Sequence, residues 1–235
     1  TRTFIYAGLN VILINVVAFL LALLVVKKLK LRNLYRAGFF LPNLIGGLIL
    51  GYIWQFIYNE ALITSGIMES SLIQNGDTAL FALILVVMWQ YAGYIMMIYI
   101  AALQNVPQDL IEAAEIDGAG PMQRLRHIVL PLVAQAFTVA MFLTLTTAFK
   151  QFDTVVSLTQ GGPATLTPQW LMNLLDLATP RSVQSTQLIT NDIYDTGYTQ
   201  KDFALGQAKA IVFFLILGVI ALGQVYFSKK REVEL

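Results

Sequence analysis

Five long apolar segments constrain the fold of this chain more than any other feature. Each has about the 20 residues that a helix needs to cross the hydrocarbon core of a membrane, and they cover approximately residues 4–26, 37–58, 79–103, 129–149 and 208–227. Only 12% of the 235 residues are charged, roughly half the share that a soluble domain carries. We therefore expect an all-α fold, a polytopic bundle of five transmembrane helices.

Basic residues between these segments predict the orientation, because cytoplasmic loops carry an excess of Lys and Arg. They follow the first, third and fifth segments: Lys27, Lys28, Lys30, Arg32, Arg36, Arg124, Arg126, Lys229, Lys230 and Arg231. All three regions fall on one side of a five-span bundle, so the N-terminus is expected outside and the C-terminus in the cytoplasm. Nothing resembling a cleavable signal carries residue 1 outward, and an earlier span is expected to precede it.

Several classes of site are excluded by the residues that the sequence lacks. It has no cysteine and one histidine, which excludes thiolate chemistry and makes a metal centre improbable. We expect His127 to be a polar residue near the lipid headgroups. A net charge of +1 without a basic patch gives no sign of nucleic-acid binding. The sequence contains no Gly-rich phosphate loop ending in GK[ST], so ATP is expected to bind elsewhere and the chain is not expected to be an enzyme.

One polar block, "LIEAAEIDGAGPMQRLRHIVLPL", interrupts this apolar chain on the cytoplasmic side. Gly118 and Gly120 end one helix and Pro121 starts another, with Pro107 suited to the first turn of the first helix. A shallow face is formed by residues at positions i, i+3, i+4 and i+7, namely Leu110, Ala113, Ala114 and Asp117. We expect a loop of two short helices over residues 105–131, in which Asp117 pairs with Arg124 or Arg126. In the second helix three apolar residues recur at helical spacing, namely Met122, Leu125 and Ile128. The alternative is an interfacial loop that only connects two spans.

"EAAEIDGAG" followed by "HIVLP" resembles the EAA signature of permease subunits in binding-protein-dependent ABC importers. "YRAGFFLPNLIGGLILGYIWQFIYN" and "FDTVVSLTQGGPA" are similar to further stretches of that family, and the MalF-type sugar permeases are the most similar subfamily. The likeness covers nearly the whole chain, so residues 1–235 form one permease domain. MalF-type members usually have a further N-terminal span. The external loop 150–207 here holds an apparent insertion, residues 165–184, with a short helix expected over 168–178. We expect this insertion to contact a solute-binding protein or to cover the pore mouth.

The resemblance implies a role for the polar block as well. In that family the EAA loop docks in a groove of a cytoplasmic ATPase, with alanines in close contact and a glycine at the turn. The coupling positions implied in this sequence are Glu112, Ala113, Ala114, Asp117, Gly118, Arg124, Ile128 and Pro131. The implied partners are a second permease subunit in a heterodimer, two ATPase subunits that use ATP and Mg²⁺, an extracellular solute-binding protein and the lipids of a bacterial cell membrane. No cofactor is expected on this chain.

Polar residues within the spans are candidates for a solute path, because they are costly in lipid. The candidates are Asn43, Gln55, Gln90, Gln135 and Gln151, with Asn10 and Asn15 in the first span. Amides together with aromatic residues (Trp54, Trp89, Tyr91, Tyr94) suit a neutral sugar. The alternative for each amide is a hydrogen bond between helices, which is common in membranes.

Other functions remain as alternatives. The same architecture serves glycerol phosphate or polyamines, although no buried basic or acidic cluster is apparent to hold either solute. An ion-coupled secondary carrier is less favoured, because neither intramembrane acids in a relay nor an internal repeat is visible. An intramembrane enzyme would need a catalytic constellation that the spans lack. Lys150 and Asp153 are expected to form a helical pair, or else a gate or a contact to the binding protein.

Overall fold

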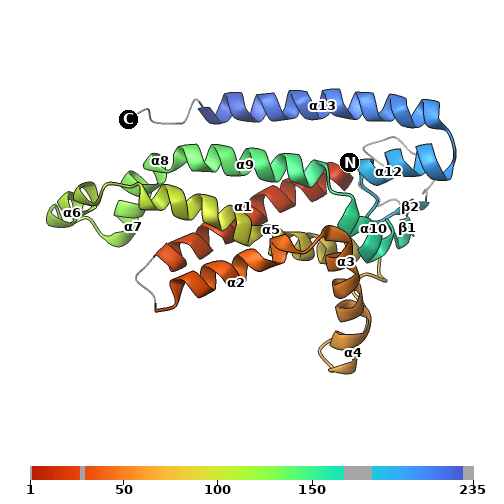
Figure 1. The fold of residues 1–235 in the computed structure, drawn as a ribbon, viewed down its shortest axis with the longest axis horizontal. Helices are drawn as coiled ribbons and strands as arrows, with labels where there is room; N and C mark the ends of the chain where they lie inside the picture. The colour runs from red at the N-terminus through yellow and green to blue at the C-terminus, as the bar shows by residue number, and fades with distance from the viewer. Residues whose placement is uncertain (1, 27–29, 167–181, 230–235) are drawn as a thin grey trace. The chain divides into compact units, whose positions relative to one another are not determined.

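The structure is a computed structural model that describes residues 2–26, 30–166 and 182–229 (Figure 1). Its helices are α1 (Arg2–Val26), α2 (Arg32–Leu44), α3 (Gly47–Phe56), α4 (Leu62–Thr64), α5 (Ala79–Gln104), α6 (Gln108–Ile116), α7 (Pro121–Arg124), α8 (Leu130–Leu132), α9 (Ala134–Phe149), α10 (Asp153–Thr159), α12 (Ile189–Tyr194) and α13 (Phe203–Lys229). Three wider π-helical turns join them, η1 (Ile57–Ala61), η2 (Leu125–Val129) and η3 (Asp195–Thr199). The expected helical bundle is confirmed, with one small addition: strands β1 (Ala164–Leu166) and β2 (Ser182–Gln184).

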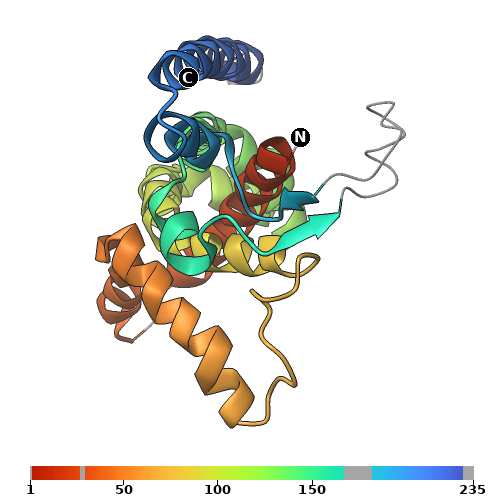
Figure 2. The ribbon, with the colours of Figure 1, turned by 90° about the vertical axis from the view of Figure 1, so that its right-hand side faces the viewer.

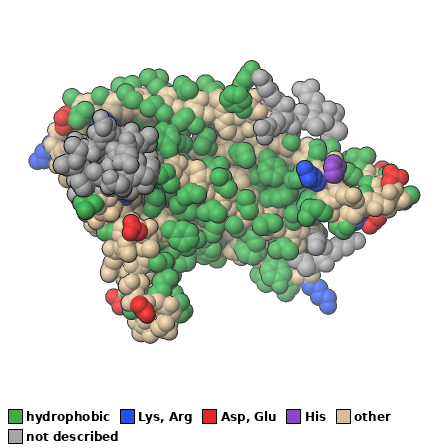
Figure 3. Space-filling view, turned by 180° about the vertical axis from the view of Figure 1, so that it is seen from behind, with side chains coloured by type: hydrophobic (Ala, Val, Ile, Leu, Met, Phe, Trp, Pro, Cys, Tyr) green, Lys and Arg blue, Asp and Glu red, His purple; other side chains and the backbone are tan. Residues whose placement is uncertain are grey.

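Three helices of the described residues, α1, α5 and α13, are long and apolar enough to cross a membrane. Two bent helix pairs bring the number to five if each pair forms one span. Hydrophobic side chains cover the middle of the face in Figure 3, and few charged side chains interrupt them. In α13 none of the most apolar window is buried within the chain. Such a surface is compatible with lipid or with protein partners in a membrane.

Two of the five expected spans are broken helices rather than continuous ones. The segment expected over 37–58 is interrupted between α2 and α3 with a bend of 98°. Pro42 lies inside α2 and lacks an N–H donor, and Gly46 has an extended backbone (φ −59°, ψ 141°) that ends the helical hydrogen bonding. The segment expected over 129–149 bends by 68° at Val133, between α8 and α9. Neither break was expected from apolar length alone.

The chain folds into two compact units, which are described separately. Unit 1 comprises Thr1–Asn10, Ile45–Met88 and Ala148–Phe214. Within it, α3 packs directly against α10, because a Cβ atom at Gly51 would lie only 1.9 Å from Ser157 Oγ. Ser157 Oγ also donates a hydrogen bond to the Gly47 carbonyl (3.3 Å), and Gln55 Nε2 donates to the Leu158 carbonyl (3.2 Å). A small residue at the contact and two side-chain hydrogen bonds therefore hold these two short helices together.

The expected insertion in the external loop begins and ends at the β1–β2 ladder. The strands are antiparallel, with Ala164 opposite Gln184 and Leu166 opposite Ser182, and they lie side by side in Figure 2. The predicted boundaries, residues 165 and 184, thus fall on paired strands that close the base of the insertion. The helix predicted over 168–178 lies outside the described residues.

Unit 2 comprises Val11–Leu44, Trp89–Thr147 and Leu215–Leu235. Asn15 joins three of its helices, since its Nδ2 donates to Thr144 Oγ1 (2.9 Å) and its Oδ1 accepts from the Tyr99 hydroxyl (2.6 Å). Phe19 and Phe137 pack on the Tyr99 ring, with centroid separations of 5.4 and 4.8 Å. Asn15 therefore forms hydrogen bonds between helices. This is the alternative to a solute contact that the sequence left open for each amide.

Helices α2 and α5 approach each other at backbone distance in unit 2. A Cβ atom placed on Gly93 would lie 1.8 Å from the Phe39 carbonyl oxygen. Only glycine leaves room for this contact, which explains why a glycine interrupts the apolar sequence of α5. The same device, a small residue at a helix contact, recurs in both units and is common in membrane bundles.

Candidate coupling loop and solute path

Helix α6 ends at a glycine turn. Gly118 has a φ of +80°, which favours glycine because it has no Cβ atom. The Asp117 N–H donates to the Ala113 carbonyl (3.0 Å) and the Ala119 N–H to the Ala114 carbonyl (2.9 Å), which satisfies the end of the helix. The expected break at Gly118 is therefore confirmed. Pro107 immediately precedes α6 and lies outside its first turn.

An ion pair links the two short helices of the loop, but it differs from the predicted one. Arg124 Nη1 lies 2.7 Å from Glu115 Oε1, whereas Asp117 makes no ion pair within the described ranges. The prediction that Asp117 pairs with Arg124 or Arg126 is wrong, because Asp117 caps the end of α6 and the longer Glu115 side chain reaches α7. Gln123 Oε1 accepts a hydrogen bond from the Gly120 N–H (2.8 Å) at the start of α7. Figure 1 shows α6 and α7 close to each other at the left, where α5 ends and α8 begins.

The second helix of the loop widens before it reaches α9. In η2 the Leu130 N–H donates to the Leu125 carbonyl, one residue further back than in an α-helix. Pro131 follows and cannot donate a hydrogen bond to His127, which accounts for the local widening. Of the three residues at helical spacing, Met122 is 72% exposed, while Leu125 and Ile128 are half-buried.

Side-chain exposure divides the predicted coupling residues into two groups. Four are exposed, Glu112, Ala113, Asp117 and Gly118, and four are half-buried, Ala114, Arg124, Ile128 and Pro131. Sequence reasoning missed Ile116, whose side chain is 87% exposed at the end of α6. An apolar residue directly before a glycine turn was the available signal. The loop thus has a mixed apolar and acidic surface, and the Glu115–Arg124 ion pair connects its two helices.

His127 makes a local contact with the backbone. Its Nδ1 lies 3.0 Å from the Gln123 carbonyl, one turn earlier, and its side chain is exposed. Among the described residues, no group of three His, Cys, Asp or Glu side chains is placed to hold a metal ion. Nothing in this geometry gives His127 a ligand role.

The amides predicted to line a solute path lie in different environments. Gln55 is bonded to the Leu158 carbonyl, Gln90 and Gln151 are buried, and Asn43 is half-buried. Gln135 is exposed and lines a cavity of about 410 Å³ in unit 2, beside the ends of the α6–α7 loop. That cavity lies between the end of α5 and the start of α9 and is otherwise lined mainly by small apolar residues such as Ala101, Ala102 and Ala136. The other four amides do not line it.

The predicted helical pair of Lys150 and Asp153 is also wrong. Helix α9 ends at Phe149 and α10 begins at Asp153, so the two residues do not share a helix. The pairing assumed that α9 continues past residue 150. A gate or a contact to a binding protein at these residues stays a prediction.

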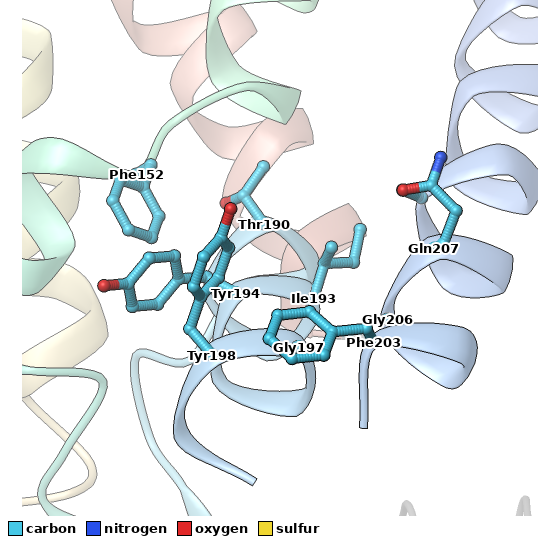
Figure 4. Close-up of a pocket in the computed structure, with 10 residues that line it drawn as sticks. Phe152, Thr190, Ile193, Tyr194, Gly197, Tyr198, Phe203, Gly206 and Gln207 are labelled. Carbon is cyan, nitrogen blue, oxygen red and sulfur yellow. The ribbon is translucent and has the colours of Figure 1, made fainter. Parts of the chain in front are cut away.

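A second cavity, here called the aromatic pocket, lies in unit 1 and was missed by sequence reasoning. It has a volume of about 440 Å³ and is lined by Phe152, Thr190, Ile193, Tyr194, Gly197, Tyr198, Phe203, Gly206, Gln207 and Ala210. Figure 4 shows the aromatic rings of α12, η3 and the segment before α10 on one side and the start of α13 on the other. No alternation or motif in the sequence joins these positions, which come from three separate segments.

Comparison with known proteins identifies the family. The family model described as "Binding-protein-dependent transport system inner membrane component" matches residues 14–232. This chain belongs to that family.

Individual relatives and a solved structure agree with this assignment. The chain is 44% identical, over 98% of its length and 74% of the relative, to the probable starch degradation products transport system permease protein AmyD of Thermoanaerobacterium thermosulfurigenes. It is 27% identical, over 92% of its length and 69% of the relative, to the sn-glycerol-3-phosphate transport system permease protein UgpA of Yersinia enterocolitica. A bacterial alginate ABC transporter, solved in complex with an alginate pentasaccharide-bound periplasmic protein, has the same fold (TM-score 0.77, 20% identity, 97% of this chain and 76% of that chain).

The binding-protein-dependent permease family accounts for much of the chain's organisation. The matched residues contain both the α6–α7 loop and the aromatic pocket. As an inner-membrane component the chain is a multi-pass membrane protein, and it serves transport rather than catalysis.

Proposed function

We propose that this chain is the membrane-spanning permease subunit of an ATP-driven importer for a neutral saccharide. The α6–α7 loop is the observation that carries the proposal. It exposes Glu112, Ala113 and Ile116 together. The helix that carries them ends at Gly118, whose positive φ favours glycine. A short, internally braced loop of this kind suits a rigid contact with a partner in the cytoplasm.

The partner at this loop would be an ATPase, in two copies that bind ATP and Mg²⁺, since the chain has no phosphate loop of its own. A second permease would complete the bundle, and an extracellular solute-binding protein would deliver the solute. The alginate transporter, crystallised with its periplasmic protein, supports the last partner. The basic residues Arg124 and Arg126 favour a cytoplasmic position for the loop, with the start of the chain outside.

The loop is built to transmit motion. It follows α5 after a three-residue connection, and through η2 and α8 it leads into α9. A displacement of the loop by the ATPases would therefore be passed to two spanning helices at once. That supports alternating access by movement of helices, with no chemical step on this chain.

The solute class rests on relatives and on charge. A relative with 44% identity is named for starch degradation products. The described residues that line the two cavities include no Lys, Arg, Asp or Glu, whereas a phosphate ester calls for charged or bidentate donors. A neutral saccharide is therefore favoured over glycerol phosphate, although a relative with 27% identity is named for that solute.

A bulky side chain on the loop tests the proposed coupling. Ala113→Trp should reduce both ATPase co-purification and ATP-driven saccharide uptake by roughly tenfold or more, as expected for a central interface position. Ala61→Trp, at an exposed alanine of η1 in unit 1, is the matched control and should leave both unchanged. Unaltered co-purification and uptake in Ala113→Trp would show that the loop is not the docking site.

A further inference from the structure

The aromatic pocket of unit 1 combines open ring surfaces with hydroxyl and amide groups. Tyr194 and Tyr198 are stacked, with centroids 5.0 Å apart and ring planes 24° from parallel. They are nevertheless 49% and 67% exposed, so much of each ring is not covered by the chain. Phe152 packs on Tyr194 at 5.1 Å and Phe203 on Tyr198 at 5.9 Å, which extends the aromatic surface on both sides (Figure 4).

The π-helical turn η3 positions these rings. Tyr194 immediately precedes η3 and Tyr198 lies within it, and such turns occur frequently at functional sites. Opposite them, α13 comes very close to η3, because a Cβ atom on Gly206 would lie 3.0 Å from Gly197 Cα. This contact puts Gln207, the next residue of α13, on the rim of the pocket.

Polar bonds hold the two walls together beside the pocket. Lys209 Nζ lies 2.8 Å from Asp192 Oδ2 and 2.7 Å from Thr196 Oγ1, which ties α13 to α12 and η3. The Thr190 hydroxyl donates to the Gln151 carbonyl and anchors α12 near Phe152. These bonds hold the pocket walls in place without a ligand. A preformed site spends less conformational entropy when a ligand binds.

The lining has the chemistry that a sugar ring requires. A pyranose has an apolar C–H face that packs on aromatic rings, and hydroxyls that bond to phenol and amide groups such as those of Tyr198 and Gln207. Among the described residues, the lining includes no charged side chain, and the volume of about 440 Å³ suits a small ligand.

We propose that the aromatic pocket is a saccharide subsite, which takes one ring of the neutral oligosaccharide at the extracellular end of the permease. The inference rests on the proposed function, because it assumes that saccharide is the solute. A helix of a partner subunit is the competing occupant. It would favour aliphatic side chains, whereas Ile193 and Ala210 alone supply them among the described lining residues.

The test measures binding of maltotriose to the complete transporter complex in lipid nanodiscs without binding protein. Tyr198→Leu keeps apolar volume but removes the aromatic face, and should weaken binding at this subsite by about three- to tenfold, the value of one ring contact. Tyr198→Phe keeps the ring and should retain most of the affinity. Tyr52→Leu, at an exposed tyrosine of α3 outside the pocket, is the control and should bind as the wild type does.

Wild-type affinity in Tyr198→Leu would overturn the inference and assign the pocket to apolar packing against a partner subunit. Failure of the wild-type complex to bind maltotriose would overturn it as well. The proposed function is judged separately, by ATP-driven uptake in proteoliposomes with the binding protein present. If saccharide is taken up and Tyr198→Leu binds maltotriose with wild-type affinity, the subsite is rejected and the importer assignment stands.

Discussion

The α6–α7 loop and the aromatic pocket both expose functional side chains, but contacts of different range in the sequence hold them in place. In the loop, Glu115 pairs with Arg124 and Gln123 caps Gly120, so every bond joins near neighbours in sequence. In the pocket, Thr190 binds Gln151 across 39 positions of the chain. A local structure is set by local signals, such as a glycine with positive φ. A pocket assembled from distant segments depends on how helices pack, and it should be more sensitive to changes in that packing.

The largest effect is expected at the closest backbone approach of the pocket. Gly206→Val places branched side-chain atoms against the Gly197 backbone, where even a Cβ atom would be 3.0 Å away. Overpacking of this kind costs about 1–3 kcal/mol. We expect a lower thermal midpoint of the purified complex and loss of maltotriose binding. Gly218→Val, in the same helix with open space around it, is the matched control. Equal midpoints for the two variants would contradict the close contact.

A comparable substitution in the loop should disturb coupling more than stability. Gly118→Val forces a β-branched residue to a φ of +80°, at a cost of about 1–2 kcal/mol confined to one turn. We expect uptake and saccharide-stimulated ATPase activity to fall while maltotriose binding is retained. Gly118→Asn should preserve most of the activity, because Asn tolerates this backbone conformation. If valine and asparagine behave alike, positive φ is not what the loop requires.

The Lys209–Asp192 pair tests whether the pocket walls depend on long-range contacts. Both side chains are partly exposed, so removing the pair with Lys209→Met should change stability by only about 0.2–1 kcal/mol. The geometry of α13 against η3 should nevertheless loosen, and maltotriose affinity should fall. Lys201→Met, at an exposed lysine outside the pocket, provides the comparison. An affinity that is the same in both variants would mean that the Lys209–Asp192 pair does not hold the pocket walls.

The smallest effect is expected for the ion pair in the loop. A double-mutant cycle of Glu115→Gln and Arg124→Gln should give a coupling energy of about 0.5 kcal/mol, since the Glu115 side chain is 62% exposed. ATPase activity stimulated by transport is the sensitive readout, because the pair braces α6 against α7. Additive effects of the two changes on this activity would argue against such bracing.

The sequence predicted the backbone turns of the loop more accurately than the course of the spanning helices. Gly118, Gly120 and Pro121 marked the turn correctly, because each acts on its own backbone. It failed for Asp117, since the choice between two neighbouring acids depends on which one faces α7. At the broken helix before Gly47, the apolar length of the segment predicted a span but did not show how sharply the helix bends.

The amides show the same limit. Asn15 and Gln55 were both polar residues in apolar segments, and composition offered no means of separating a solute contact from a contact between helices. Their partners, Thr144 and the Leu158 carbonyl, lie 129 and 103 positions away in the chain. Only packing brings such groups within hydrogen-bond distance.

The sequence by itself determined that this is an all-helical membrane protein with a glycine-turned polar loop, and the loop's resemblance to the EAA signature pointed to the permease family. Those conclusions follow from hydropathy and backbone preference, which act over a few residues or within one span. Only the tertiary structure decided which acid braces the loop, which amide joins helices, and that Phe152, Tyr194, Tyr198 and Gln207 line one cavity. The physical reason is that side-chain contacts between distant segments depend on helix breaks and close backbone approaches, and composition records neither.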